Sequence, residues 1–317
     1  MRAAVAAMIL STVFLFSLTH AVSGKLGGEP DVAPVVLILV DDGLSWTSAE
    51  GPGLAPVFDN AAVASLSTSQ GRTPEDPRIG YVLLGAGARA DTSILPERLP
   101  REREKIPGSF TRPATTVHPG ALGDALAHSR ARAAAVGGRA ALVVMDSKGR
   151  VPITYGGGEP AKHSKEALRR KADLVAVEVS GTREAAEVAA VARTFGAVVT
   201  IAAPNAPEGS ANLTPFALAT FGAATPGVLY SPGTRTAGLM SNEDVAPTLL
   251  ARLGFQAPPE MAGRAAEVRP GNAAQVSRLQ ERLAFVDEER GVVWTLLVGV
   301  SVAAFALGGI QRGRAGI

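Results

Sequence analysis

VVLILV, at Val35–Val40, is followed directly by Asp41, Asp42 and Gly43. An unbroken run of β-branched and aliphatic residues that ends at turn formers is typical of a strand covered on both faces. Such strands belong to parallel sheets, in which ligands bind beyond the carboxyl ends of the strands. The sequence therefore predicts an α/β domain, and it places Asp41 and Asp42 where divalent-cation ligands are expected, with a turn residue or a helix cap as the alternative.

The same alternation of elements continues along the chain. Apolar runs predict strands at Ala141–Met145, Leu174–Val179 and Ala197–Ile201, and Ala-rich segments predict helices at Ala121–Ala135 and Thr182–Phe195. Strands that alternate with helices indicate a mostly parallel sheet with helices on both faces.

One helix start has a clear signature. Ser241 and Asp244 have the spacing of a capping box, and they predict a helix that runs to Leu253 and stops at Gly254.

Composition narrows the classes of function. The 317 residues include 31 Lys and Arg against 29 Asp and Glu, and only 5% are aromatic. A net charge of +2 and few stacking side chains argue against nucleic acid as a partner. There is no cysteine, so disulfides and thiolate metal sites are excluded, and any metal must be bound by oxygen or histidine.

The N-terminus has an export profile. Arg2 precedes an apolar run from Ala3 to Leu18, and small residues follow up to Ser23. Residues 1–23 are therefore predicted to be a signal peptide cut after Ser23, with an uncleaved N-terminal anchor as the alternative. Either interpretation exports the rest of the chain.

The C-terminus carries a candidate membrane span. Val292–Ile310 contains no charge and is about the ~20 residues that a spanning helix needs, although a buried core helix is the alternative. Arg312 and Arg314 follow it, so residues 311–317 are expected to be a cytoplasmic tail. The prediction is a single-pass protein of the cell membrane, with an extracytoplasmic domain at 24–270 and a polar stalk at 271–291.

Two loops offer further candidate groups. SLSTSQGRT, at Ser65–Thr73, contains Thr68 as a possible nucleophile, but no base or metal ligand lies nearby in sequence, and a Ser/Thr-rich loop is the alternative. GAGAR ends at Arg89, a possible anion contact, although it lacks the spacing of a dinucleotide or P-loop motif. His118, His128 and His163 stand apart, without the spacing of a zinc site.

Three segments carry a family resemblance. VVLILVDDG, GVLYSPGTRTAGLMSNEDVAPTLLARLGF and APPEMAGR, between Val35 and Arg264, together resemble the alkaline phosphatase superfamily, especially its sulfatase and phosphopentomutase-like branches and their membrane-linked bacterial members. The resemblance implies two divalent ions, zinc, manganese or magnesium, flanking a Ser or Thr nucleophile. It implies Asp41 as a metal ligand, Asp42 as its substitute, and Thr68 as the nucleophile.

The family's other metal ligands have no counterpart. Pro204 and Asn205 stand where an Asp-His pair belongs, Glu178 has no accompanying histidine, and the stretch from Leu213 to Met240 contains none. Two dications need several anionic or imidazole donors. The sequence therefore predicts a degenerate, catalytically inactive member without a cofactor, acting in binding or assembly at the cell envelope.

Two alternatives stay open. A metal-dependent hydrolase of phosphate or sulfate esters could use Asp41, Asp42, Glu178 and a hydroxyl of the 65–73 loop. The chain could also belong to a larger envelope assembly, because Gly299, Ala303, Gly308 and Gly309 would let partner helices approach the predicted span closely.

Overall fold

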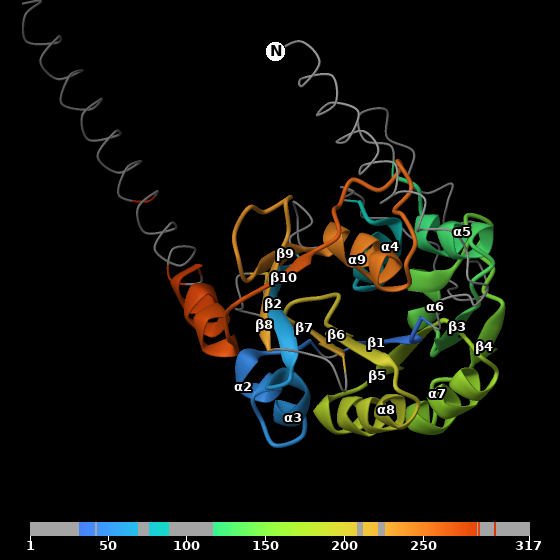
Figure 1. Ribbon diagram of the computed structural model, residues 1–317, viewed down its shortest axis with the longest axis horizontal. Helices are drawn as coiled ribbons and strands as arrows, with labels where there is room; N and C mark the ends of the chain where they lie inside the picture. Colours follow the sequence, from blue (N-terminus) through green and yellow to red (C-terminus); the bar gives the residue numbers. More distant parts are fainter. Residues whose placement is uncertain are drawn as a thin grey trace, which may run out of the picture. The chain divides into compact units, whose positions relative to one another are not determined.

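The computed structural model describes residues 32–41, 43–68, 76–88, 117–207, 212–220, 226–283, 285 and 295. The chain divides into two units, Met1–Val32 and Ala33–Ile317. Val32 is the one described residue of the first unit, so the fold reported below is that of the second (Figure 1).

One sheet organises the described residues. Its ten strands are β1 (Val35–Val40), β2 (Ala61–Ser67), β3 (Ala133–Val136), β4 (Ile153–Tyr155), β5 (Leu174–Val179), β6 (Val198–Ala202), β7 (Leu213–Thr220), β8 (Gly227–Tyr230), β9 (Leu239–Ser241) and β10 (Glu267–Arg269). The strand order is β10-β8-β2-β7-β6-β1-β5-β3-β4, and β9 pairs with β2.

Most neighbouring strands run parallel. β1 lies between β5 and β6, and its pairing with both is parallel, as are the pairings of β3 with β4 and β5. The antiparallel pairs are β6 with β7, β7 with β2, and β8 with β10. The carboxyl ends of β1, β3, β5 and β6 therefore meet at one edge of the sheet.

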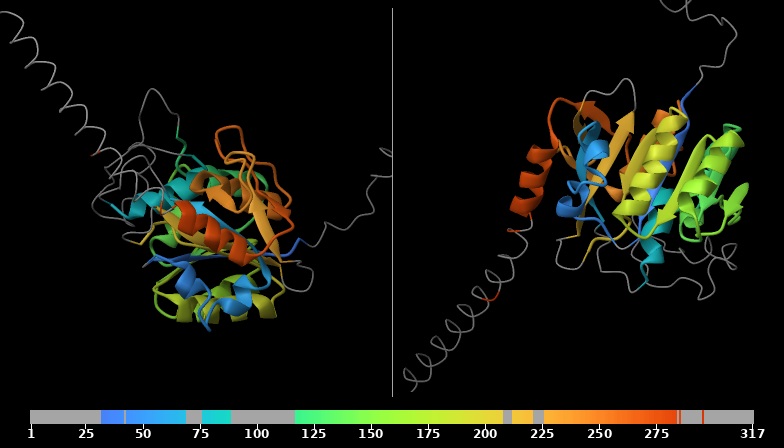
Figure 2. Two further views of the ribbon diagram at one scale, coloured as in Figure 1. Left: turned by 90° about the vertical axis from the view of Figure 1, so that its left-hand side faces the viewer. Right: turned by 90° about the horizontal axis from the view of Figure 1, so that it is seen from below.

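Helices cover both faces of the sheet (Figures 1 and 2). One face carries α2 (Trp46–Ala49), α3 (Ala55–Phe58), α7 (Pro160–Arg169) and α8 (Thr182–Thr194). The other carries α4 (Arg78–Ala86), α5 (Ala121–His128), α6 (Ala140–Val144) and α9 (Val245–Arg252). Alternate residues of β1 enter the two cores, with Leu37 on one side and Ile38 on the other, so the predicted α/β class with helices on both faces is confirmed.

One predicted element is wrong, and the helix predicted just before it is too long. Ala141–Met145 was predicted as a strand, but residues 140–144 form helix α6, which packs so closely on α4 that a Cβ on Gly85 would lie 2.1 Å from the Val143 carbonyl oxygen. A short apolar run cannot be assigned to helix or strand by periodicity alone. The helix predicted over Ala121–Ala135 ends at His128, because Arg130 adopts a left-handed conformation and β3 follows.

The capping box before α9 is confirmed, and it is part of a larger network. Asp244 accepts a hydrogen bond from the Ser241 amide (3.0 Å) and another from the Arg264 amide (2.9 Å). Thr248 accepts one from the Ala266 amide (3.0 Å). Asp244 is 1% exposed, so the Asp and Thr of this motif fasten the closing segment to the helix.

The membrane predictions fall almost wholly outside the described residues. No helix among these residues is long and apolar enough to cross a bilayer. Residues 1–23 lie outside them, and so do Val292–Ile310, apart from Thr295, and the tail 311–317.

Candidate functional site

Three charged side chains meet at the carboxyl ends of the parallel strands. Asp41 follows β1, and its amide donates to the Val179 carbonyl at the end of β5 (2.9 Å). Glu178 is in β5 and lies beside Leu39 of β1 in the strand register. Arg139 lies in the turn between β3 and α6, and β3 also pairs with β5.

Among the described residues, two side chains donate to the Asp41 carboxylate. Its Oδ1 accepts a hydrogen bond from the Tyr81 hydroxyl (2.9 Å) and another from the Arg139 guanidinium. Tyr81 belongs to α4 and is 0% exposed. Burial, followed by the negative charge of Asp41, raises the pKa of Tyr81, so its hydroxyl stays a neutral donor.

Arg139 also holds Glu178. Its backbone amide donates to Glu178 Oε2 (2.8 Å), and its Nε lies 4.0 Å from Oε1. Burial acts to lower the pKa of Arg139, but the hydrogen bond and the charge of Asp41 outweigh it and raise the pKa. One guanidinium therefore lies between two carboxylates, one after β1 and one in the neighbouring strand β5, and its single positive charge offsets one of their two negative charges.

A glycine makes room for this arrangement. Gly137 has a φ of +97°, and a Cβ at this position would lie 2.5 Å from Glu178 Oε2. Only glycine adopts such a backbone without strain and admits the carboxylate so closely.

A second ion pair borders the cluster at the start of α4. Asp76 Oδ1 accepts from Nε of Arg78 (2.7 Å). Burial acts to raise the pKa of Asp76, but the hydrogen bonds and charge of Arg78 outweigh it and lower the pKa, with a smaller contribution from the charge of Arg139. Arg139 thus lies within electrostatic range of all three carboxylates.

Asn205 has a structural role near these strand ends. Its Nδ2 donates to the Pro77 carbonyl (3.0 Å), which ties the loop after β6 to the start of α4. A Cβ on Gly80 would lie 2.6 Å from the Pro204 carbonyl oxygen. The two residues that replace the expected Asp-His pair therefore pack against α4.

The candidate residues predicted from the sequence do not all meet. Asp41 is in the cluster, whereas Asp42 and Arg89 lie outside the described residues. Thr68 follows β2, which β6 and β7 separate from β1, a lateral distance of about 14 Å at ~4.8 Å per strand. Its hydroxyl donates to the Asn212 carbonyl (3.1 Å), so the structure does not bring Thr68 to Asp41.

As far as the structure describes it, the cluster does not fit a pair of divalent ions. Its described carboxylate donors are Asp41 and Glu178, and the Arg139 guanidinium already contacts both. Within the described part of the chain, no group of three or more His, Asp and Glu side chains could hold a metal ion. Two dications need more anionic or imidazole donors than these two carboxylates supply.

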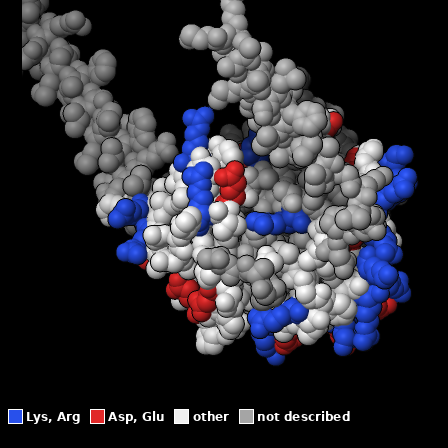
Figure 3. Space-filling view, in the orientation of Figure 1, with Lys and Arg blue, Asp and Glu red and all other residues white. Residues whose placement is uncertain are grey.

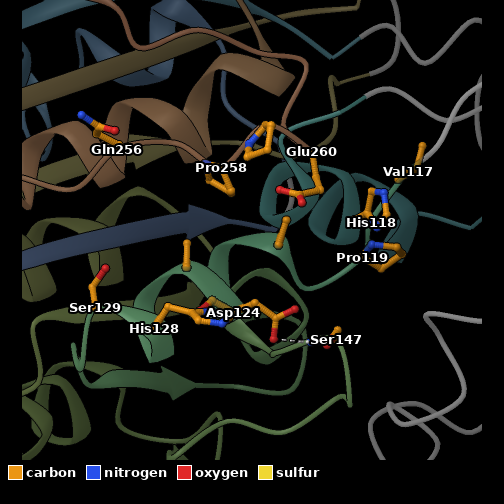
Figure 4. A pocket seen from close by; sticks show the side chains of 13 residues that line it. Val117, His118, Pro119, Asp124, His128, Ser129, Ser147, Gln256, Pro258 and Glu260 are labelled. Carbon is orange, nitrogen blue, oxygen red and sulfur yellow. Dashed lines mark hydrogen bonds between the residues drawn. The ribbon is translucent and has the colours of Figure 1, made fainter.

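A separate pocket of about 510 Å³ lies between α5 and the segment that follows α9 (Figure 4). It is lined by Val117, His118, Pro119, Ala121, Asp124, Ala125, His128, Ser129, Ser147, Gln256, Pro258, Pro259 and Glu260. His128 Nδ1 donates to the Asp124 carbonyl (2.7 Å), and Asp124 Oδ1 accepts from the Ser147 amide (3.1 Å). Its size suits a small ligand.

The fold and the cluster define an α/β domain with helices on both faces of its sheet and an ion-paired cluster of Asp41, Glu178 and Arg139 at its strand ends. No family model and no curated protein matches the chain. One solved structure, titled "Crystal structure of Ps i-CgsB in complex with k-i-k-neocarrahexaose", is similar over 74% of this chain and 75% of that chain, with 8% identity and a TM-score of 0.43. A likeness of this size assigns neither a family nor an activity.

Proposed function

We propose that this chain is a non-catalytic α/β domain, anchored outside the cell membrane by Val292–Ile310, that acts in binding or assembly at the cell envelope. The observation that carries the proposal is the Arg139 guanidinium, which contacts both Asp41 and Glu178. A fixed cation already lies where a metal-dependent hydrolase would need free carboxylates. Under this proposal the chain is a degenerate relative of the alkaline phosphatase superfamily, as the sequence motifs suggest.

The pocket supports the binding role. It combines apolar walls from Pro119, Pro258 and Pro259 with the polar groups of His118 and Glu260. A concave surface with a few convergent polar groups is the usual form of a small-molecule site. The polar groups do not require a metal in order to bind a ligand.

Calorimetric titration of the full chain in detergent with zinc, manganese and magnesium tests the non-catalytic assignment. We expect no tight binding of any of the three ions and no metal-dependent turnover of an aryl phosphate ester. Tight uptake of two ions per chain would overturn the proposal.

One observation favours the alternative hydrolase. Asp41 and Glu178 do lie together at the strand ends, as a metal site of this kind would require. A working enzyme would show metal-dependent ester hydrolysis that Asp41→Ala abolishes while the circular dichroism spectrum stays unchanged. Turnover that survives Asp41→Ala would exclude this edge as its active site.

A further inference from the structure

The segment that leads toward the predicted membrane span packs against the domain. Residues 273–283 are helical, as is Phe285, and we call these described residues the docked helix. Val276 is 1% exposed and belongs to one of the two cores. A Cβ on Gly238 would lie 2.9 Å from Val276 Cγ2, so the helix lies close against the turn before β9.

Gln280 fixes the docked helix at a second point. Its Oε1 accepts from Trp46 Nε1 (2.6 Å) and from the Ser65 hydroxyl (2.9 Å). Ser65 is 0% exposed and Trp46 is 7% exposed. A half-buried amide that satisfies two buried donors from different elements holds the helix in one orientation.

The opposite face of the docked helix is exposed. Ala274, Arg278, Glu281, Arg282 and Phe285 recur at spacings of three and four residues, and all five are exposed. Positions with this spacing form one face of a helix.

This face combines the cationic side chains of Arg278 and Arg282 with one carboxylate, Glu281, and the apolar ring of Phe285. Blue side chains lie over the docked helix at the left of the molecule (Figure 3). Among the described residues, the exposed large hydrophobic side chains are Val32, Val268 and Phe285, and Phe285 is the most exposed of them at 63%. Val268 is in β10, the edge strand that directly precedes the docked helix.

The sequence sets how far this face can lie from the predicted span. Six residues separate Phe285 from Val292, and even a fully extended chain covers only about 24 Å over that interval. Because Gln280 holds the docked helix on the domain, this short tether keeps the exposed face of the docked helix within about 24 Å of the predicted span.

We propose that the exposed face of the docked helix, with edge strand β10, rests on the headgroups of an anionic membrane. Phe285 enters the interface, while Arg278 and Arg282 face lipid phosphates. This inference rests on the membrane anchoring in the proposed function. The ligand it names is the lipid surface of the membrane that the chain itself spans.

The absence of cysteine allows single labelling sites in the full chain. Glu281→Cys reports on the docked helix, and Glu187→Cys is a matched control, an exposed glutamate on α8. Lys165→Cys reports on α7, which packs beside β5 and β3 near the edge of the sheet opposite to β10. Each variant carries an environment-sensitive fluorophore and is reconstituted in phosphatidylcholine vesicles, with or without phosphatidylglycerol and with headgroup-labelled quencher lipid.

We expect quenching at position 281 and none at positions 187 and 165. Arg278→Gln/Arg282→Gln should reduce quenching at 281 by about twofold or more in anionic vesicles, and added salt should have the same effect. If position 281 is unquenched, or 165 is quenched in its place, while the chain resists alkaline extraction, the docking inference fails. If alkali extracts the chain, the membrane anchoring fails instead.

Discussion

Arg139 is the side chain on which the ionic cluster depends. Its removal leaves Asp41 and Glu178, whose side chains are 24% and 23% exposed, as two adjacent negative charges. The guanidinium is 36% exposed, so solvent screening keeps the effect below the 3–5 kcal/mol seen when a fully buried pair is broken. Arg139→Met should lower the free energy of unfolding in urea by about 1–2 kcal/mol.

Arg150→Met is the control for that prediction. Arg150 pairs with Asp146, but its side chain is 66% exposed, and its loss should cost no more than about 1 kcal/mol. Adding Glu178→Gln to Arg139→Met should recover part of the loss, because one of the two unpaired charges disappears. Equal stability of Arg139→Met and the wild type would contradict the role assigned to the guanidinium.

Gly137 is a second position at which one added side-chain carbon is expected to change the stability of the fold. Gly137→Ala introduces a Cβ 2.5 Å from Glu178 Oε2 at a φ of +97°. Both the strained backbone and the displaced carboxylate should destabilise the fold, by about 1–3 kcal/mol in chemical denaturation. Gly158→Ala has nothing within 4 Å of its new Cβ and should change stability little. Similar losses in the two variants would show that close approach at Gly137 is unimportant.

Gln280 is one of the side chains that hold the docked helix on the domain. Gln280→Leu removes the acceptor that Trp46 and Ser65 share and leaves two buried donors unpaired, at a cost of about 1–3 kcal/mol each. We expect the docked helix to detach, seen as a shift in Trp46 emission, measured with Trp294→Phe as background, and as faster proteolysis near residue 280. Glu281→Gln, on the exposed face, should change neither readout.

The strands differ in how well the sequence predicts them. β1 and β5 are rich in valine and leucine, and both were predicted with correct bounds. β3 and α6 read AAAV and AALVV, and alanine at buried positions suits either conformation, so long-range packing decided between them. Because of that error, Arg139, which lies between the two elements, was not predicted to be near the strand ends.

The same reasoning explains which cluster residues could be predicted. Asp41 was predicted because it follows a strand whose type was evident from sequence. Glu178 was noted from its strand as well. Tyr81 acts through a contact with Asp41, 40 positions away in the chain, and nothing in its local sequence distinguishes it from an ordinary buried aromatic residue. A residue belongs to the site because it lies near the others in space, and the sequence immediately around that residue does not show this.

For the whole molecule, the lowered pKa values of Asp76 and Asp146 imply that the free energy of unfolding falls in acid. Arg78 lowers the pKa of Asp76, and hydrogen bonds from Arg150 and Lys148 lower that of Asp146, in each case against the opposing effect of burial. The unfolded chain therefore binds more protons than the folded one near the ordinary carboxyl value of 3.8. Stability from these groups is present above that pH and is lost as pH falls through the lower folded-state values.

We expect the free energy of unfolding to fall steeply below about pH 4. Asp76→Asn/Asp146→Asn should be less stable than the wild type at neutral pH, because two ion pairs are gone, yet its stability should change less between about pH 5 and pH 2. Urea denaturation across that range measures both slopes. Parallel slopes for the two proteins would mean that other carboxylates govern acid unfolding, and that the ion pair at the start of α4 contributes little to the fold.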